Sequence, residues 1–147
     1  MNPITVLVAD DHQIVREGLL ALLKQEADIH VIGEAENGRQ AVALARTLAP
    51  AVVLMDISMP LLNGLEATRQ ILRAAPAIRV ILLSVHDDDA YVERAMAMGA
   101  AGYLSKLTAS PLLAGAISQA CKGGPFLGPG LSKRRLRRRT PPRPTTT

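Results

Sequence analysis

Residues 51–84, AVVLMDISMPLLNGLEATRQILRAAPAIRVILLS, contain two short apolar runs separated by a stretch with helical periodicity. The runs Ala51–Met55 and Val80–Ser84 have the length and apolar content of buried strands. Between them, Gly64–Ala75 has the pattern of an amphipathic helix that Pro76 closes. A helix that links two strands carries the chain back across the sheet, so that the strands lie parallel. This stretch therefore predicts a β-α-β unit.

The same alternation continues on both sides of this unit. The other predicted strands are Ile4–Ala9, His30–Ala35 and Ala101–Ser105, and the other predicted helices are Gln13–Glu26, Gly38–Leu48, Asp88–Met98 and Ser110–Lys122. Strict alternation of strand and helix is typical of a parallel sheet that helices cover on both faces. We therefore predict an α/β fold, a doubly wound (βα)5 domain over residues 1–122.

Length and composition restrict the class of protein. The chain has 147 residues, of which 48% are hydrophobic and 20% charged, which suits one globular domain with a tail. No apolar run approaches the length of a membrane span, and the N-terminus lacks the pattern of a secretory signal. Cys121 is the single cysteine, so an internal disulfide and a multi-cysteine zinc site are excluded. We expect a cytoplasmic protein without a membrane partner.

Charge is divided unevenly along the chain. The formal net charge is +4, but residues 132–147 hold seven basic groups and no acid. The remaining ten basic and thirteen acidic groups give residues 1–131 a net charge of −3. We interpret residues 123–131, which are rich in glycine and proline, as a linker, and residues 132–147 as a disordered basic tail.

Polar side chains follow four of the five predicted strands. Asp10 and Asp11 follow the first strand, Asp56 follows the third, Ser84 ends the fourth, and Lys106 follows the fifth. In an open parallel sheet, the ligand site lies at the carboxyl ends of the strands. We therefore expect these residues to meet at one edge, and the second strand, which delivers no such group, to be an outer strand.

This set of side chains favours phosphoryl chemistry. Three adjacent carboxylates repel one another, which raises at least one pKa unless a cation lies among them. A hard divalent ion such as Mg2+ or Mn2+ suits oxygen ligands. A metal, a lysine and a hydroxyl around a carboxylate nucleophile make a clamp for a phosphoryl group. The structural alternative is that single acids at strand ends cap helices, which is the role we expect for Asp87–Asp89.

Four longer motifs carry a family resemblance: VLVADDHQIVREGL, VVLMDISMPLLNGLEA, VILLSVHDDDAYVERAMAMGAAGYLSK and PLLAGAISQACKGGPFLGPGL. Over residues 4–131 they resemble the receiver domain of bacterial two-component response regulators, and in particular the NarL/FixJ (LuxR-type) branch. The resemblance implies a flavodoxin-like, CheY-like fold with strand order 2-1-3-4-5. It also implies a phosphoprotein of a phosphorelay and not a metabolic enzyme, with at most self-phosphorylation from small donors and self-dephosphorylation.

The resemblance further implies a role for each residue of the site. Asp56 would accept a phosphoryl group from a sensor histidine kinase. Asp11, Asp56 and the backbone carbonyl of Ser58 would hold Mg2+, and Asp10 would do so largely through water. Lys106 and Ser84 would contact the phosphoryl group, and Tyr103 would change rotamer as part of the conformational switch. The resemblance also implies a phosphorylation-dependent homodimer. Ser58 and His86 match positions that tune the phosphoaspartate lifetime, and Met59-Pro60 and Gly64 match the turn after the acceptor.

Members of this branch continue into a DNA-binding helix-turn-helix module that regulates transcription. After Leu131 the chain has no apolar periodicity that could build one. The expectation is therefore either a truncated regulator, in which DNA binding belongs to the missing module, or a stand-alone receiver that acts by protein-protein interaction.

Three other functions remain open on the residues alone. A metal-dependent aspartyl phosphohydrolase would need a second acid two residues after its nucleophile, where this chain has Ser58. A dinucleotide site would need a glycine-rich turn after the first strand, where Asp10 and Asp11 would repel phosphate. The tail motif KRRLRRR could bind nucleic-acid phosphates, but no aromatic residue or recognition helix accompanies it.

Overall fold

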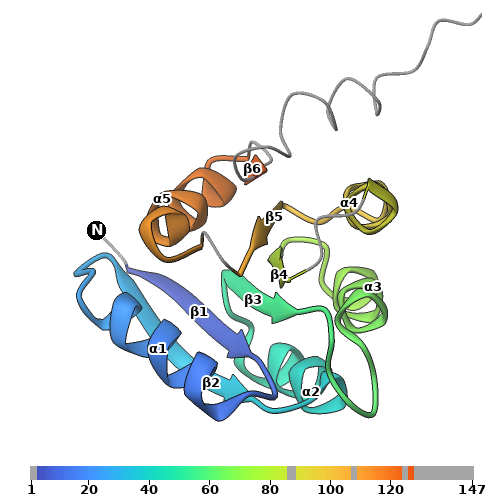
Figure 1. The fold of residues 1–147 in the computed structure, drawn as a ribbon, viewed down its shortest axis with the longest axis horizontal. Helices are drawn as coiled ribbons and strands as arrows, with labels where there is room; N and C mark the ends of the chain where they lie inside the picture. The colour runs from blue at the N-terminus through green and yellow to red at the C-terminus, as the bar shows by residue number, and fades with distance from the viewer. Residues whose placement is uncertain (1–2, 86–88, 107–108, 124–125, 128–147) are drawn as a thin grey trace, which may run out of the picture.

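A computed structural model describes residues 3–85, 89–106, 109–123 and 126–127. Strands and helices alternate along them, as predicted (Figure 1). The strands are β1 (Ile4–Ala9), β2 (Ile29–Ala35), β3 (Val52–Asp56), β4 (Arg79–Ser84), β5 (Gly102–Ser105) and β6 (Phe126–Leu127). The helices are α1 (Gln13–Lys24), α2 (Gly38–Leu48), α3 (Gly64–Ala74), α4 (Asp89–Ala97) and α5 (Ala109–Cys121).

The strands form one parallel sheet in the order β2-β1-β3-β4-β5-β6. This arrangement confirms the expected order 2-1-3-4-5 and the outer position of β2. The sixth strand is a difference, because the sequence predicts a loop at residues 123–130. Gly102 pairs with Phe126 and Tyr103 with Leu127. A two-residue strand between glycines and prolines has no periodicity of its own, so pairing with β5 alone defines it.

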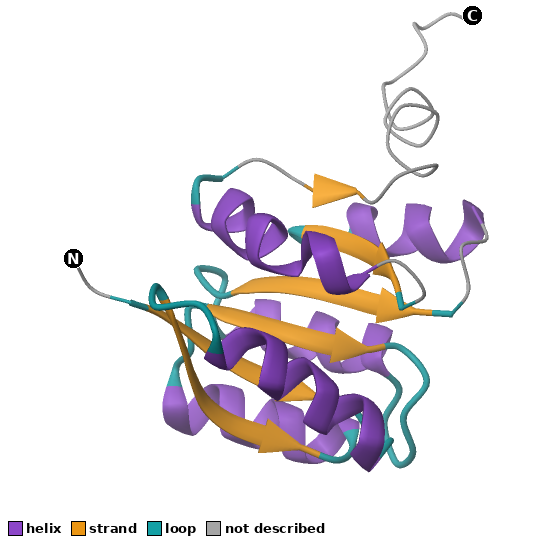
Figure 2. Ribbon diagram, turned by 60° about the vertical axis from the view of Figure 1, so that its left-hand side comes forward, coloured by secondary structure: helices purple, strands orange, loops and turns teal. Residues whose placement is uncertain are grey.

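Helices cover both faces of the sheet (Figure 2). On one face, Leu19 and Leu23 of α1 and Leu113 and Ile117 of α5 are buried against alternate residues of the central strands, such as Leu54. Because both faces are buried, each central strand is apolar along its length, which is why the strands appear in the sequence as continuous apolar runs.

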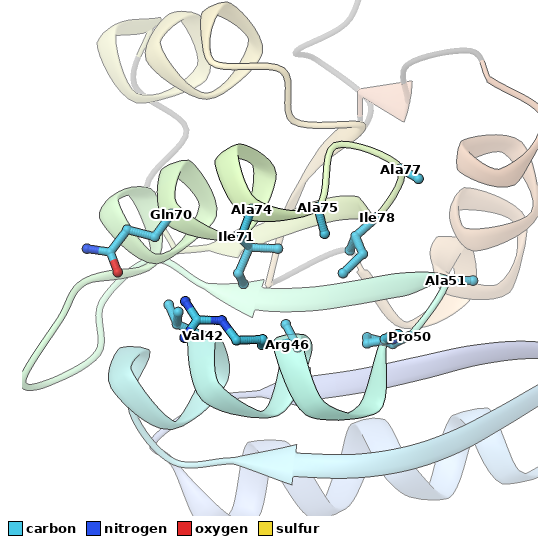
Figure 3. A pocket seen from close by; sticks show the side chains of 12 residues that line it. Val42, Arg46, Pro50, Ala51, Gln70, Ile71, Ala74, Ala75, Ala77 and Ile78 are labelled. Atoms are coloured by element: carbon cyan, nitrogen blue, oxygen red, sulfur yellow. The ribbon is translucent and has the colours of Figure 1, made fainter.

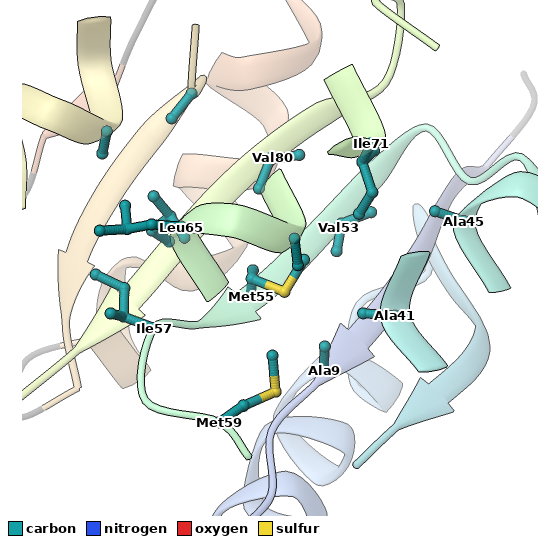
Figure 4. Packing of buried hydrophobic residues seen from close by; sticks show 14 of the residues in the cluster. Ala9, Ala41, Ala45, Val53, Met55, Ile57, Met59, Leu65, Ile71 and Val80 are labelled. Carbon is teal, nitrogen blue, oxygen red and sulfur yellow. The ribbon is translucent and has the colours of Figure 1, made fainter. Parts of the chain in front are cut away.

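The opposite face packs against α2, α3 and α4. Figure 4 shows Leu65 and Ile71 of α3 together with Val53 and Met55 of β3, and Ala41 of α2 over β1. The small alanine side chains let α2 approach the sheet closely. This rigid layer supports the loops at the carboxyl ends of β1 and β3.

Most predicted boundaries differ from the structure by one or two residues at helix ends, where the last turn tightens. After α1, for example, the Gln25 N–H donates to the carbonyl of Leu22, three residues back. The predicted start of α2 is confirmed, because the Asn37 side chain accepts a hydrogen bond from the Gln40 N–H at 2.8 Å. Asp87 and Asp88, predicted to cap α4, lie outside the described residues, as do residues 128–147 with the basic tail. Among the described residues, none of the helices has the length and apolar character of a membrane span.

Candidate functional site

Four neighbouring strands deliver polar side chains to one edge of the sheet. Asp10 follows β1, Asp56 ends β3, Ser84 ends β4 and Lys106 follows β5. Backbone hydrogen bonds extend the pairing past the strand ends, since the Asp10 N–H donates to the Ala35 carbonyl and the Lys106 N–H to the Ser84 carbonyl. The site therefore lies beside β1 and β3, where the strand order reverses, as the sequence predicts.

Lys106 links the two buried aspartates. Its Nζ lies 2.9 Å from Asp10 Oδ2 and 3.2 Å from Asp56 Oδ1. The Lys106 side chain is 12% exposed, whereas those of Asp10 and Asp56 are 0% and 2% exposed. One cation thus compensates two carboxylates in a place where water screens little, which leaves the cluster with an excess of negative charge.

The other carboxylate oxygens are not the ones that form the ion pairs with the lysine. Asp10 Oδ1 accepts a hydrogen bond from the His12 N–H at 2.9 Å. Asp56 Oδ2 is buried, and no donor for it exists among the described residues. The Asp11 side chain is 27% exposed, but its Oδ1 is buried and accepts no hydrogen bond from the described residues. Buried carboxylate oxygens without donors are costly unless a cation binds them.

These oxygens fit a divalent cation. Asp10, Asp11, His12 and Asp56 each offer one ligand atom, and these four atoms all lie within 4.8 Å of one another. A set dominated by carboxylate oxygens suits a hard ion such as Mg2+, which keeps several waters. This is the acidic pocket that the resemblance to receiver domains predicts.

The pKa of Asp56 is raised from 3.8 to about 6. Burial is the main cause, and the neighbouring Asp10 carboxylate adds to it, while Lys106 and the Ser58 N–H lower the pKa in part. The sequence predicts that crowded carboxylates raise at least one pKa, and this residue shows the effect. A cation at the free oxygens would favour the ionised form and oppose the shift.

The loop after β3 holds the Asp56 backbone in place. The Gly64 N–H donates to the Ile57 carbonyl at 2.7 Å, and a Cβ added to Gly64 would lie 2.1 Å from the Asp56 carbonyl oxygen. Only glycine allows this approach. Within this loop, the Met59 side chain is buried (Figure 4), whereas Leu61 is exposed and has a φ of 68°. The turn expected at Met59, Pro60 and Gly64 is therefore present.

The remaining predicted residues lie at different depths. Ser84 is buried at the end of β4, and its carbonyl accepts the Lys106 N–H at 2.9 Å. Tyr103 is fully buried in the core cluster under α4. Ser58 is exposed, and its N–H donates to Asp56 Oδ1 at 3.2 Å. His86 lies outside the described residues, so its predicted role stays a prediction.

Sequence reasoning missed Arg16. Its Nη1 donates to the Asp10 carbonyl at 2.7 Å, and its Nε donates to Glu34 Oε1 at 3.0 Å. The guanidinium thus ties α1 to the loop of Asp10 and to β2. One signal in the sequence was available: a cation near the start of a helix opposes the helix dipole, which calls for a local partner.

The apolar hollow between α2 and α3 is separate from this site (Figure 3). It has a volume of about 400 Å³, and residues that precede β3 and β4, including Pro50 and Ile78, line it with Val42, Arg46 and Ile71. It therefore opens near the amino ends of these strands, whereas the aspartates lie at the carboxyl ends.

Comparisons with known proteins agree with the geometry. The family model of the response regulator receiver domain matches residues 6–118. Among solved structures, a LuxR-family response regulator from Aurantimonas sp. SI85-9A1 superposes with a TM-score of 0.87 at 30% identity, covering 95% of this chain and 100% of the other. The receiver domain of the response regulator NarL from Mycobacterium tuberculosis superposes with a TM-score of 0.79 at 34% identity, covering 84% and 99%.

Curated relatives are longer than this chain. The response regulator UvrY of Escherichia coli is 42% identical over 130 residues, which make up 88% of this chain and 60% of UvrY. The response regulator GacA of Pseudomonas aeruginosa is 41% identical over 130 residues, or 88% of this chain and 61% of GacA. The chain thus spans about three fifths of these relatives. On the family match and these identities, it belongs to the response regulator receiver domain family, in its NarL/FixJ-type branch.

Proposed function

We propose that Asp56 accepts a phosphoryl group from a sensor histidine kinase and that the domain uses this modification to control an output. The observation that carries the proposal is the position of Asp56: its carboxylate is buried, ion-paired with Lys106 through Oδ1, and without a donor among the described residues at Oδ2. A buried carboxylate beside a lysine can attack phosphorus through one oxygen while its other oxygen binds a cation.

In the proposed transfer, an Asp56 oxygen forms a P–O bond as the P–N bond of the kinase phosphohistidine breaks. Lys106 Nζ, which forms ion pairs with the Asp10 and Asp56 carboxylates, would neutralise part of the phosphoryl charge. Asp10, Asp11, Asp56 and the Ser58 carbonyl are the proposed Mg2+ ligands. Bound Mg2+ supplies charge neutralisation and orientation of the phosphoryl oxygens.

The proposed switch involves Ser84 and Tyr103. A phosphoryl group adds between one and two negative charges, roughly, to a buried site. Ser84 ends the strand next to β3 and would donate a hydrogen bond to the new group. Tyr103 packs in the core beside α4, so its rotamer would couple that movement to the surface of α4, β5 and α5. Ser58 and His86 are proposed to set the phosphoaspartate lifetime.

The proposed output is transcription. The relative DegU of Brevibacillus brevis is a transcriptional regulatory protein, 40% identical over 128 residues that make up 54% of its length. We propose residues 1–122 as the regulatory domain, 123–131 as a linker whose strand β6 pairs with β5, and 132–147 as a basic tail, with action in the cytoplasm. DNA binding would belong to a helix-turn-helix module outside this chain, and a phosphorylation-dependent homodimer would carry the signal to it. The alternative is a stand-alone receiver that acts by protein-protein contacts.

Phosphorylation with a small phosphodonor tests the assignment. The wild type and Asp56→Asn are incubated with phosphoramidate and MgCl2, and the intact masses are measured before and after treatment with hydroxylamine, which cleaves acyl phosphates. The wild type is expected to gain one hydroxylamine-sensitive phosphoryl group, and the variant none. Equal phosphorylation of both proteins, or of neither, would contradict the proposal.

A further inference from the structure

His12 lies at the oxygens that the lysine leaves free. Its ring Nδ1 is 3.2 Å from Asp10 Oδ1 and 3.2 Å from Asp11 Oδ1. Lys106, in contrast, contacts Asp10 Oδ2 and Asp56 Oδ1. Asp10 therefore contacts the histidine through one oxygen and the lysine through the other, so His12 lies beside the carboxylate oxygens that a cation would bind.

An independent observation points to a ligand on this side. Asp56 Oδ2 belongs to a side chain that is 2% exposed, and no donor reaches it within the described residues. Asp10, Asp11, His12 and Asp56 each offer one ligand atom, and these atoms lie within 4.8 Å of one another. A buried carboxylate oxygen without a donor, on a residue of such a group, is stabilised by a shared cation.

The distances suit neighbouring ligands of one ion. In octahedral coordination with bonds of about 2.1 Å, adjacent ligand atoms lie about 3.0 Å apart. The two separations of 3.2 Å from His12 Nδ1 to carboxylate oxygens are close to this edge. His12 is the residue before α1, and its side chain makes no capping hydrogen bond to the helix. Capping therefore does not account for the position of the ring.

We propose that His12 Nδ1 is a ligand of this metal site, which therefore also takes first-row transition-metal dications of the Co2+ to Zn2+ class. This inference rests on the proposed function, because the same aspartates hold the metal in both. An imidazole nitrogen is a poor ligand for Mg2+ but a good one for these borderline ions. Three carboxylates with one imidazole thus favour transition metals over Mg2+ more strongly than carboxylates alone.

The ring orientation makes the proposal specific. If Nδ1 carries a proton, it donates to the two carboxylates. If Nδ1 carries a lone pair, that lone pair faces two anionic oxygens, and only a shared cation makes the arrangement favourable. His12 is 60% exposed, so the ring reaches this position without closing access from solvent.

The test compares Co2+ and Mg2+ binding by titration calorimetry at one fixed pH. The proteins are the wild type, His12→Gln, and the matched control His30→Gln, which changes an exposed histidine at the start of β2. Proton NMR of the Co2+ form gives a second readout, because a coordinated imidazole shows a strongly shifted, exchangeable N–H signal. Circular dichroism of each protein checks that it is folded.

We expect His12→Gln to weaken Co2+ binding by about tenfold or more, to change Mg2+ binding by less than about threefold, and to lose the shifted N–H signal. His30→Gln should bind both ions as the wild type does. Co2+ affinity and a shifted signal that survive in His12→Gln would overturn the inference.

Asp11→Asn separates this inference from the proposed function. If it abolishes Co2+ binding while His12→Gln leaves binding and signal intact, the aspartate site stands and the histidine ligand is wrong. If Asp11→Asn leaves Co2+ and Mg2+ binding unchanged, the metal does not occupy this cluster, which overturns both.

Discussion

Lys106 lies closer to Asp10 than to the proposed acceptor, with its Nζ 2.9 Å from Asp10 Oδ2. The contact joins the residue after β5 to the residue after β1, across the two strands between them in the sheet. The lysine therefore has a structural role before any phosphoryl group arrives: it compensates charge that the fold buries.

Replacing Lys106 by methionine leaves Asp10 and Asp56 buried without a cation. We expect the free energy of unfolding to fall by about 3–5 kcal/mol in the absence of divalent ions, because an uncompensated buried charge is expensive. Urea denaturation in the presence of EDTA measures this. In an Asp56→Asn background the same substitution should cost less, since one of the two carboxylates is gone. An equal cost in both backgrounds would mean that Asp56 is not coupled to the lysine.

The raised pKa of Asp56 makes stability depend on pH. Its pKa is about 6 in the folded protein, against an ordinary value of 3.8, so the folded state takes up a proton first as the pH falls. Without divalent ions, the stability contributed by this group should increase from pH 7 to pH 5, by on the order of 1–2 kcal/mol. Chemical denaturation at each pH in EDTA measures it, and Asp56→Asn should remove the dependence.

Glu66 sets the lower limit of that experiment. Its pKa is lowered to about 2, chiefly by the hydrogen bond from Arg69. Its stabilising contribution is present above the usual pKa of 4.5 and is lost as the pH falls from there toward 2. Measurements above pH 5 therefore exclude the contribution of Glu66, and the comparison with Asp56→Asn identifies that of Asp56. A stability that decreases from pH 7 to pH 5 in the wild type, relative to Asp56→Asn, would contradict the assignment.

Gly64→Ala should disturb the acceptor directly. The new Cβ would lie 2.1 Å from the Asp56 carbonyl oxygen, so the loop or the strand end must move. We expect a loss of about 2 kcal/mol or more in stability and slower phosphorylation from small donors. Gly18→Ala is the matched control, because Gly18 lies in α1 with no atom within 4 Å of an added Cβ. That variant should be stabilised by about 0.5–1 kcal/mol, and its phosphorylation rate should be unchanged.

Arg16 should position the loop of Asp10 and Asp11. Arg16→Met removes the hydrogen bond to the Asp10 carbonyl and the pair with Glu34, so we expect weaker Mg2+ binding and a stability loss of about 1–2 kcal/mol. Glu34→Gln should have a smaller effect, because the Glu34 side chain is half exposed and the bond to Asp10 remains. Phosphorylation rates of both variants at low and at saturating Mg2+ distinguish weaker Mg2+ binding from a direct loss of phosphorylation. The proposed role requires that saturating Mg2+ restores most of the rate of Arg16→Met.

Much of the fold follows from local sequence. The strands are buried on both faces, so they appear as continuous apolar runs, and the helices show their own periodicity between them. The polar residues at the strand ends could be grouped without a structure, because parallel strands bring their carboxyl ends to one edge. Asp10, Asp56, Ser84 and Lys106 meet there for that reason.

Other features depend on contacts that no local pattern contains. The strand β6 exists through its pairing with β5, although glycine and proline surround it in the sequence. The roles of Arg16 and His12 depend on where the start of α1 lies relative to β2 and to the aspartates. Side-chain direction across such distances is set by packing of the whole domain.

By itself, the sequence determined the parallel sheet and which charged residues share its carboxyl edge, because periodicity is a local property of the chain and a helix between successive strands makes them parallel. Only the tertiary structure decided how these charges are arranged. It placed Lys106 at Oδ2 of Asp10 and Oδ1 of Asp56, and His12 at Oδ1 of Asp10, since each carboxylate has two oxygens and only the packed loops decide which oxygen faces which partner.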